Sequence, residues 1–459
     1  MLLNRAAFLL ILTVIVVMTM LYGGVHQPVL ALFYVSAAVL AILWAADSWM
    51  KGGAAISKNL LQVPLLMLGM WGVLQVLPFG TFTDSSVVAG IPRAISADPF
   101  ATSLAVVQIF SLLIFFAAML VYINTAKRLR SVAAFVTIFG FAYAFFAILQ
   151  SVLSPEAIFG IYKPAAGRPF GTFVNRNDYA AMMVMFMSVP LGMLFSGVIA
   201  RDKRLLYVVA IALMATSLLL SQSRGGLIAF IAEVILLVIL TNRQRGKKKL
   251  VLSFALSALF LLIAVAGAFF VGGETSLVRF SGGDMTAEAP TETTSRFHIW
   301  TVTARMIEHN IPLGVGLGGF PAVYPQFDTA TGYQRVEQAH NDYLQLLSDG
   351  GLVGAALGIF FLYLLIKQGR EAIRVENTLR RGIAAGALAG VAAVLVHSAF
   401  DFVLHITAVS LMFLLLLAIL VASCRTYGDD SEDLPRARGH HRRKASVKPL
   451  RSGSSGTLL

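Results

Sequence analysis

Long apolar stretches recur along the whole chain, and they constrain its fold more than any other feature. Each is close to the roughly 20 residues that a helix needs to cross a bilayer. We place twelve of them, at residues 6–22, 29–46, 60–78, 102–122, 131–153, 178–199, 205–221, 226–241, 250–271, 351–367, 382–400 and 405–423. With 58% hydrophobic and only 13% charged residues, the chain is not an ordinary soluble domain. The sequence therefore predicts an all-α integral membrane protein with about twelve transmembrane helices.

The basic residues indicate how these helices are oriented, because Lys and Arg gather on the cytoplasmic side of a membrane. If the chain starts in the cytoplasm, the inner segments hold 27 of the 36 Lys and Arg residues and the outer segments hold 9. We therefore expect both termini to be cytoplasmic and the first apolar stretch to remain uncleaved. The net charge of +13 is then a topology signal and a set of anchors for membrane lipids, with no need for a nucleic-acid partner.

The apolar stretches and the polar segments between them divide the chain into four expected regions. Residues 1–271 hold the first nine helices, 272–350 form one large periplasmic loop, 351–424 hold the last three helices, and 425–459 form a basic cytoplasmic tail. The tail has no apolar pattern, so we expect it to be disordered.

Two segments of the large loop have a recognisable pattern. Phe297, Trp300, Val302, Ala304 and Ile307 recur at helical spacing, which predicts a helix with this face partly buried. The glycine-rich "GVGLGG" that follows does not continue from the strand of a βαβ unit, so we do not interpret it as a nucleotide-binding loop. It is interpreted as a turn that lets the backbone approach a neighbouring segment closely.

Arginines are concentrated at the expected outer face, where basic residues are otherwise scarce. Arg224 lies in the turn "SQSRGG" between two apolar stretches, Arg168 and Arg176 lie in "GRPFGTFVNRND", and Arg296 lies in the large loop. A guanidinium can pair with two phosphate oxygens at once, so several of them together suggest a lipid-linked phosphate or pyrophosphate ligand. The alternative for Arg224 is a side chain that only snorkels to the membrane surface from a tight turn.

His340 stands directly before a predicted short helix that Asn341 or Asp342 can cap and that Gly350–Gly351 can end. The positive end of a helix disfavours an imidazolium and attracts anions, so a neutral histidine there can act as a base beside a phosphate. The alternative is a surface histidine that is hydrogen-bonded to its own loop.

Acidic residues are few at the outer face, and their roles stay open at this point. Asp401, in "HSAFDFVLH", can orient His340 or an arginine, or it can form a structural pair with His397 or His405. The outer face has no Asp-x-Asp pair, and its histidines are not at metal-ligand spacing. We therefore expect a metal-independent protein that uses no cofactor.

These segments together resemble the O-antigen ligase and polymerase superfamily. The resemblance is carried by "SQSRGGLIAF", "SRFHIW", "PLGVGLGGF" and "HNDYLQLLSDGGLVG", in that order along the chain. It implies a membrane glycosyltransferase of the GT-C type in the bacterial inner membrane, with a periplasmic active site and a glycan donor on undecaprenyl pyrophosphate. It implies His340 and Arg224 as catalytic residues. The expected pyrophosphate- or glycan-binding residues are Arg168, Arg176, Arg224, Arg296 and Asn341.

The superfamily divides by acceptor. The single dominant outer loop and the short tail favour an O-antigen ligase, which transfers the glycan to a sugar hydroxyl of the lipid A–core oligosaccharide. The alternatives are an O-antigen polymerase and a protein O-oligosaccharyltransferase. A transporter of lipid-linked saccharides is a further alternative, but the sequence has no inverted repeat, and its polar residues lie on one face, not at the midplane.

Overall fold

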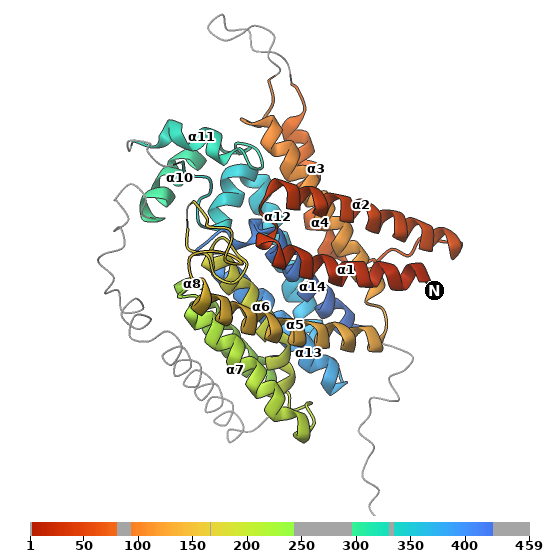
Figure 1. Cartoon of the computed structure of the whole chain (residues 1–459). Helices are drawn as coiled ribbons and strands as arrows, with labels where there is room; N and C mark the ends of the chain where they lie inside the picture. The colour runs from red at the N-terminus through yellow and green to blue at the C-terminus, as the bar shows by residue number, and fades with distance from the viewer. Residues whose placement is uncertain (1, 80–92, 166, 243–295, 330–334, 426–459) are drawn as a thin grey trace, which may run out of the picture.

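The computed structural model describes residues 2–79, 93–165, 167–242, 296–329 and 335–425 (Figure 1). Within these ranges ten helices are long and apolar enough to cross a membrane. The same ranges contain no β-sheet, only two isolated bridges. The prediction of an all-α integral membrane protein is therefore confirmed.

The ten helices that are long and apolar enough to cross a membrane are distributed along the described residues. They are α1 (Leu2–Met20), α2 (Gln27–Met50), α4 (Pro99–Tyr122), α5 (Ala126–Leu153), α6 (Arg176–Phe195), α7 (Arg204–Leu220), α8 (Arg224–Asn242), α12 (Asp342–Ala372), α13 (Thr378–His397) and α14 (Thr407–Cys424). The predicted stretch 60–78 corresponds to the 3₁₀ turn Leu60–Gln62 and the shorter helix α3 (Val63–Val76). The predicted stretch 250–271 and the tail 426–459 lie outside the described residues.

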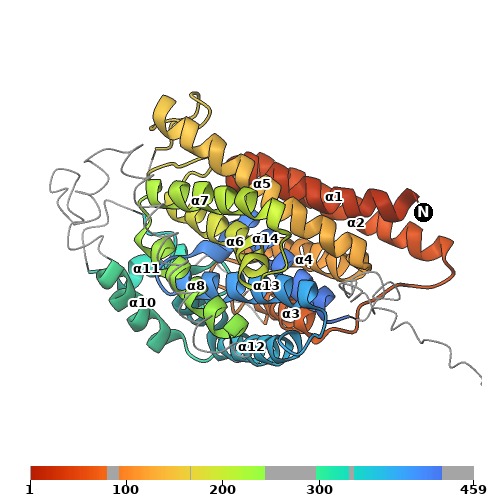
Figure 2. The same ribbon diagram turned by 90° about the horizontal axis from the view of Figure 1, so that it is seen from below.

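The centre of the bundle is formed by α6, α13 and α14, with the other helices around them (Figure 2). The apolar window of α14 is 94% buried and that of α6 is 89% buried, far above the 17% of α2. Helices α6 and α13 approach each other so closely that a Cβ atom on Gly386 would lie 2.4 Å from the backbone oxygen of Ser188. Small residues are what allow such an approach inside a membrane protein.

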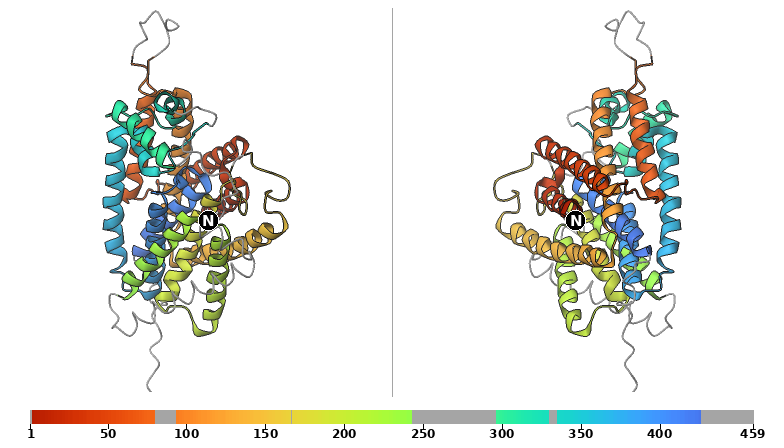
Figure 3. Two further views of the ribbon diagram at one scale, coloured as in Figure 1. Left: turned by 90° about the vertical axis from the view of Figure 1, so that its left-hand side faces the viewer. Right: turned by 90° about the vertical axis from the view of Figure 1, so that its right-hand side faces the viewer.

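Two further helices, α10 (Arg296–Asn310) and α11 (Phe320–Phe327), lie together at one end of the bundle, beside the first turns of α12 (Figure 3). We call this the α10 end. The helix predicted in the large loop is therefore present, but the prediction of which of its residues are buried was only partly right. Val302 and Ile307 are buried, whereas Phe297 is 79% exposed and Ala304 is also exposed.

The buried stripe of α10 is shifted by part of a turn from the expected one. It consists of Ile299, Val302, Thr303, Met306 and Ile307. Both stripes have helical spacing, because α10 carries apolar residues over more than half of its circumference. Periodicity alone could not decide between them, since the choice depends on which side faces α11 and α12.

The glycine-rich turn after α10 is inserted against a break in α12. Gly351 has φ 62° and ψ −154°, a conformation essentially restricted to glycine, and it separates the first turns of α12 from the rest. The backbone N–H groups of Val315 and Gly316 donate to the carbonyl oxygens of Ser348 and Asp349, at 2.9 and 3.1 Å. The expected close backbone approach is therefore confirmed, and it holds the start of α12 in place.

Candidate active site

The centre of the site is the buried carboxylate of Asp401, in the turn between α13 and α14. One of its oxygens, Oδ1, lies 3.0 Å from Nδ1 of His340 and accepts the backbone N–H of Phe402 at 3.0 Å. The other, Oδ2, lies 3.0 Å from a terminal nitrogen of Arg296 and accepts a hydrogen bond from the side-chain amide of Asn177. Asp401 therefore joins segments from four different parts of the chain through one side chain that is 1% exposed.

His340 is held in a defined orientation directly before α12. Its φ of 49° is in the left-handed region that few non-glycine residues adopt, which points to a functional constraint. Its ring packs edge-on against Phe402, with centroids 4.9 Å apart. Because Nδ1 donates to Asp401, Nε2 is the ring nitrogen that can accept a proton, and the side chain is 33% exposed.

The N-terminal ends of α6 and α8 reach the same carboxylate through a chain of hydrogen bonds. The hydroxyl of Ser223 donates to Oδ1 of Asn177 at 2.8 Å, and the amide nitrogen of Asn177 donates to Asp401. Arg224, the first residue of α8, follows Ser223 directly, and its side chain is exposed. Two hydrogen bonds therefore connect the turn that contains Arg224 to Asp401, the residue that orients His340.

Arg168 and Arg176 are brought together by a tight loop before α6. Phe170 and Phe173 form an isolated antiparallel bridge, and the N–H of Arg176 donates to the carbonyl oxygen of Arg168 at 2.9 Å. Arg176 is immediately followed by Asn177, so both arginines lie at the edge of the site. Arg168 is exposed and Arg176 is half-buried.

Asn341 has a clear structural task beside its expected binding role. Its side-chain oxygen accepts the N–H groups of Tyr343 and Leu344, at 3.0 and 3.1 Å, so it is the N-cap of α12. Its amide nitrogen donates to the carbonyl oxygen of Ala399 at 3.0 Å. These contacts attach the start of α12 to the turn that carries Asp401.

A second histidine–carboxylate pair locks the same turn from the other side. Nδ1 of His405 lies 2.9 Å from Oδ1 of Asp342, and the N–H of Leu404 donates to Oδ2 of Asp342 at 3.2 Å. The N–H of Asp342 donates to the carbonyl oxygen of Ser398 at 2.9 Å. His405 therefore belongs with Asp342, which settles one of the pairings that the sequence left open for Asp401.

The charges around these two pairs shift their pKa values in opposite directions. Burial raises the pKa of Asp401, but the hydrogen bond from His340 and the charge of Arg296 outweigh it and hold this pKa below its usual value. Burial lowers the pKa of His405, but the hydrogen bond to Asp342 and the charge of that carboxylate outweigh it and raise this pKa above its usual value. Asp401 is consequently a stable anion beside His340.

His397, the other candidate partner of Asp401, has a different environment. It is 1% exposed at the end of α13, and neither ring nitrogen has a hydrogen-bond partner within the described part of the chain. Its ring packs against the start of α8, where a Cβ atom on Gly225 would lie 2.9 Å from Nε2. The first glycine of the "SRGG" turn, Gly225, thus leaves room for a histidine close to the site.

The spacing of potential metal ligands is a further feature of the described residues. No group of three or more His, Cys, Asp or Glu side chains in these residues lies close enough to hold a metal ion. The polar side chains of the site are instead arranged as cation–carboxylate and histidine–carboxylate pairs.

The chain was next compared with known proteins. Residues 209–359 match the family model described as O-antigen ligase. This match supports the O-antigen ligase superfamily. This O-antigen ligase segment runs from α7 into the middle of α12 and includes Arg224, Arg296 and His340. A comparison with curated proteins returns no match.

The O-antigen ligase segment does not contain the whole site. Asp401, which contacts His340, lies beyond its end, and Arg168 and Arg176 lie before its start, next to the Asn177 that donates to Asp401. Of the expected residues, His340 and Arg296 both contact Asp401, and Asn341, Arg176 and Arg224 each adjoin a residue of this hydrogen-bond network in the chain. What the sequence could not assign was the role of Asp401 as their common partner, because the short string "FDFVLH" only shows that an acid is present.

Proposed function

We propose that this protein is an O-antigen ligase of lipopolysaccharide biosynthesis. It transfers a glycan from undecaprenyl pyrophosphate to a sugar hydroxyl of the lipid A–core oligosaccharide. The observation that carries the proposal is the simultaneous contact of Asp401 with His340 and Arg296. Through this contact a base and a cation, both from the O-antigen ligase segment, lie on either side of one carboxylate.

His340 acts as the general base. Nε2 takes the proton of the acceptor hydroxyl as the acceptor oxygen bonds to the anomeric carbon of the donor sugar. Asp401 keeps the proton on Nδ1 and stabilises the imidazolium that forms. General-base assistance of this kind contributes about 10²–10⁴ in rate.

The arginines balance the charge of the leaving group. As the bond between the anomeric carbon and the phosphate oxygen breaks, its electron pair leaves with undecaprenyl pyrophosphate. Arg224, with Arg168 and Arg176 at the edge of the site, binds the pyrophosphate oxygens, and Arg296 is held by its ion pair with Asp401. One direct displacement inverts the anomeric centre and requires neither a covalent intermediate nor a metal ion.

The cellular placement follows from the same proposal. The site opens on the periplasmic face of the bacterial inner membrane, both termini are cytoplasmic, and the polyprenyl chain of the donor lies among the helices. The ligase assignment over the polymerase and the protein O-oligosaccharyltransferase rests on the dominant outer loop. The matching family model is also described as O-antigen ligase.

The test is a reconstituted transfer assay. The purified protein is incubated in EDTA with O-antigen on undecaprenyl pyrophosphate and with lipid A–core, and products are resolved as a ladder on a gel. The His340→Ala variant is expected to lose transfer. The matched control is His298→Ala, because His298 forms a similar pair at 2.9 Å with a different carboxylate, that of Asp328.

Each outcome separates one part of the proposal. A ladder from the wild type and the control, with none from His340→Ala, supports a metal-independent ligase with His340 as base. Lengthening of the donor chain, or transfer to an added pilin, would show that lipid A–core is not the acceptor and would keep the rest of the mechanism. Activity that returns only with Mg²⁺ would overturn metal independence. Absence of transfer to any acceptor would favour the transporter.

A further inference from the structure

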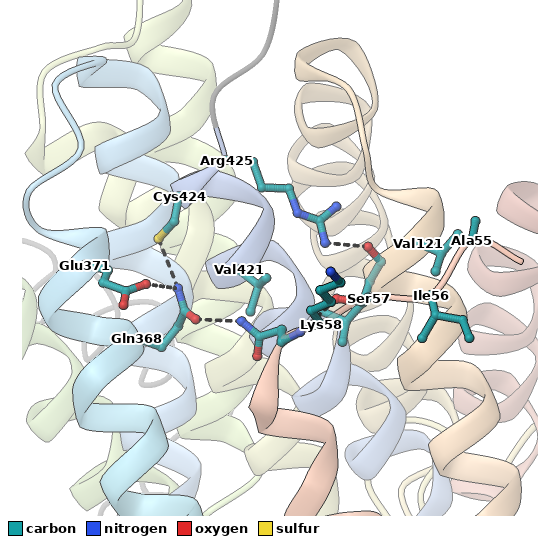
Figure 4. Close-up of a pocket in the computed structure, with 12 residues that line it drawn as sticks. Ala55, Ile56, Ser57, Lys58, Val121, Gln368, Glu371, Val421, Cys424 and Arg425 are labelled. Carbon is teal, nitrogen blue, oxygen red and sulfur yellow. Dashed lines mark hydrogen bonds between the residues drawn. The ribbon is translucent and has the colours of Figure 1, made fainter.

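A second polar pocket lies at the end of the bundle opposite the candidate active site (Figure 4). It has a volume of about 530 Å³, within the usual range for small-molecule sites. Its walls are the loop between α2 and α3 and the last turns of α4, α12 and α14. Because α12 and α14 both begin at the active site and both end here, the pocket is at the other face of the membrane.

The floor of this pocket is a fixed chain of hydrogen bonds. The amide nitrogen of Asn59 donates to the side-chain oxygen of Gln368 at 2.8 Å, and the amide nitrogen of Gln368 faces Cys424 and Glu371, at 3.3 and 3.4 Å (Figure 4). Gln368 is only 7% exposed. A buried amide in a fixed orientation gives the pocket polar groups that do not depend on flexible surface side chains.

Two cations border the same pocket. Arg425 donates to the backbone oxygens of Leu120 and Ile123, at 2.7 and 3.4 Å, so its guanidinium is held at the C-terminal end of α4. Lys58 is exposed and forms no ion pair with the described residues. Glu371 is the one acidic residue among those that line the described pocket, which leaves a net positive charge there.

Exposed apolar residues line this pocket, as Ile56 does, or lie close in the chain to its lining residues. Ile56 and Leu60, on either side of Lys58, are 68% and 52% exposed. Trp49 and Met50, at the end of α2, are 89% and 74% exposed. Tryptophan at a helix end is typical of the boundary between lipid head groups and acyl chains. The pocket therefore combines a polar, cationic interior with an edge that fits hydrocarbon.

We propose that this pocket binds the head group of an anionic phospholipid that carries hydroxyl groups, such as phosphatidylglycerol. Lys58 and Arg425 bind its phosphate, and Gln368 and Glu371 accept hydrogen bonds from its glycerol hydroxyls. Its acyl chains lie along Ile56 and Leu60. Basic pockets between helix ends are known to select such lipids by the combined charge of their Lys and Arg residues. The proposal does not depend on glycan transfer.

The test measures lipid binding to the delipidated full-length protein. Phosphatidylglycerol, phosphatidylethanolamine, phosphatidylcholine and soluble glycerol phosphate are each titrated, and binding is followed by native mass spectrometry and by the unfolding temperature. Phosphatidylglycerol is expected to bind most tightly. Lys58→Glu is expected to weaken it roughly tenfold or more, since it removes one attraction and adds a repulsion. Lys58→Gln should give a smaller loss.

The matched control is Lys203→Glu, the same charge change on an exposed residue outside the pocket. Unchanged binding in this control, with weaker binding in the Lys58 variants, supports the site. Equal loss in both would show a general surface attraction and overturn it. Tighter binding of phosphatidylethanolamine would overturn the head-group assignment. Equal binding of soluble glycerol phosphate would overturn the assignment to a lipid.

Discussion

His340 and Asp401 are 61 residues apart in the chain, and their side chains meet at 3.0 Å. His340 precedes α12, whereas Asp401 follows α13, so two complete membrane crossings lie between them. The pair resembles the histidine–carboxylate arrangement that fixes the tautomer and orientation of a catalytic imidazole in other enzymes. The geometry therefore makes Asp401 a positioning residue for His340.

Replacement of Asp401 by Asn should preserve the shape of the turn but remove its charge. The amide can present its nitrogen to His340 and so favour the wrong tautomer, and it no longer balances Arg296. We expect transfer to fall by about 10²–10⁴-fold, mainly in kcat, because loss of orientation affects the reacting state more than binding. Steady-state kinetics with both substrates measure this.

Asp328→Asn is the control for that variant, because it changes a similar histidine–carboxylate pair in α10 and α11. Comparable losses in both variants would mean that the Asp401 effect is a general loss of structure. A loss confined to KM for the donor would instead assign Asp401 to the binding of the pyrophosphate.

Arg224→Lys should be poorly tolerated. Lys keeps the positive charge but loses the planar fork that binds two phosphate oxygens. We expect at least a tenfold loss in kcat/KM for the lipid-linked donor, close to 1.4 kcal/mol of transition-state stabilisation. Arg305→Lys, an exposed change in α10, should keep normal kinetics. If Arg224→Lys kept the wild-type value, the fork of Arg224 would have no role in the reaction.

The pair formed by His405 and Asp342 should make stability depend on pH. The folded pKa of His405 is raised, so its contribution to stability is fully present below the unfolded pKa of about 6.5. That contribution is lost as the pH rises through the folded value. His405→Gln keeps a hydrogen-bond donor without the charge, so the gap in Tm between wild type and variant should be largest at and below about pH 6 and shrink as the pH rises above it. A constant gap would contradict the charged pair.

Gly351→Ala should destabilise the protein. A Cβ atom at this position would lie 2.1 Å from the carbonyl oxygen of Pro312, and the φ of 62° is strained for alanine. We expect a loss of about 2–4 kcal/mol or a failure to fold. Gly53→Ala, where no atom lies within 4 Å, is the control and should unfold at the wild-type temperature. Thermal unfolding of both variants in detergent gives the comparison.

The helices themselves could be predicted from the sequence, because apolar length is sufficient to define a membrane crossing. The positions of Arg224 and His340 at helix starts could also be predicted. Arg224 lies in the turn before an apolar stretch, and His340 directly precedes a residue that can cap a helix. These features depend on residues close together in the chain. Local sequence therefore identified most of the residues that the structure brings into the site.

The pairing within the site could not be predicted in the same way. Asp401 contacts Arg296 across 105 residues and Asn177 across 224, and such contacts depend on how α6, α10 and α13 pack against each other. The buried side of α10 could not be predicted for the same reason. Two apolar stripes have helical spacing, and the packing of α10 against α11 and α12 determines which of them is buried. Sequence thus indicated which side chains matter but not which partner each of them has.

The position of Asp401 in the connection between α13 and α14, late in the chain, has a consequence for synthesis and membrane insertion of the protein. A nascent chain emerges from its N-terminal end, so α12 and His340 are made before the residue that orients the imidazole. His340 acquires its partner only when α13 has been inserted and the chain has turned back toward α14. Under the proposed mechanism, a nascent chain therefore cannot use His340 as a base until α13 and the turn that carries Asp401 are in place.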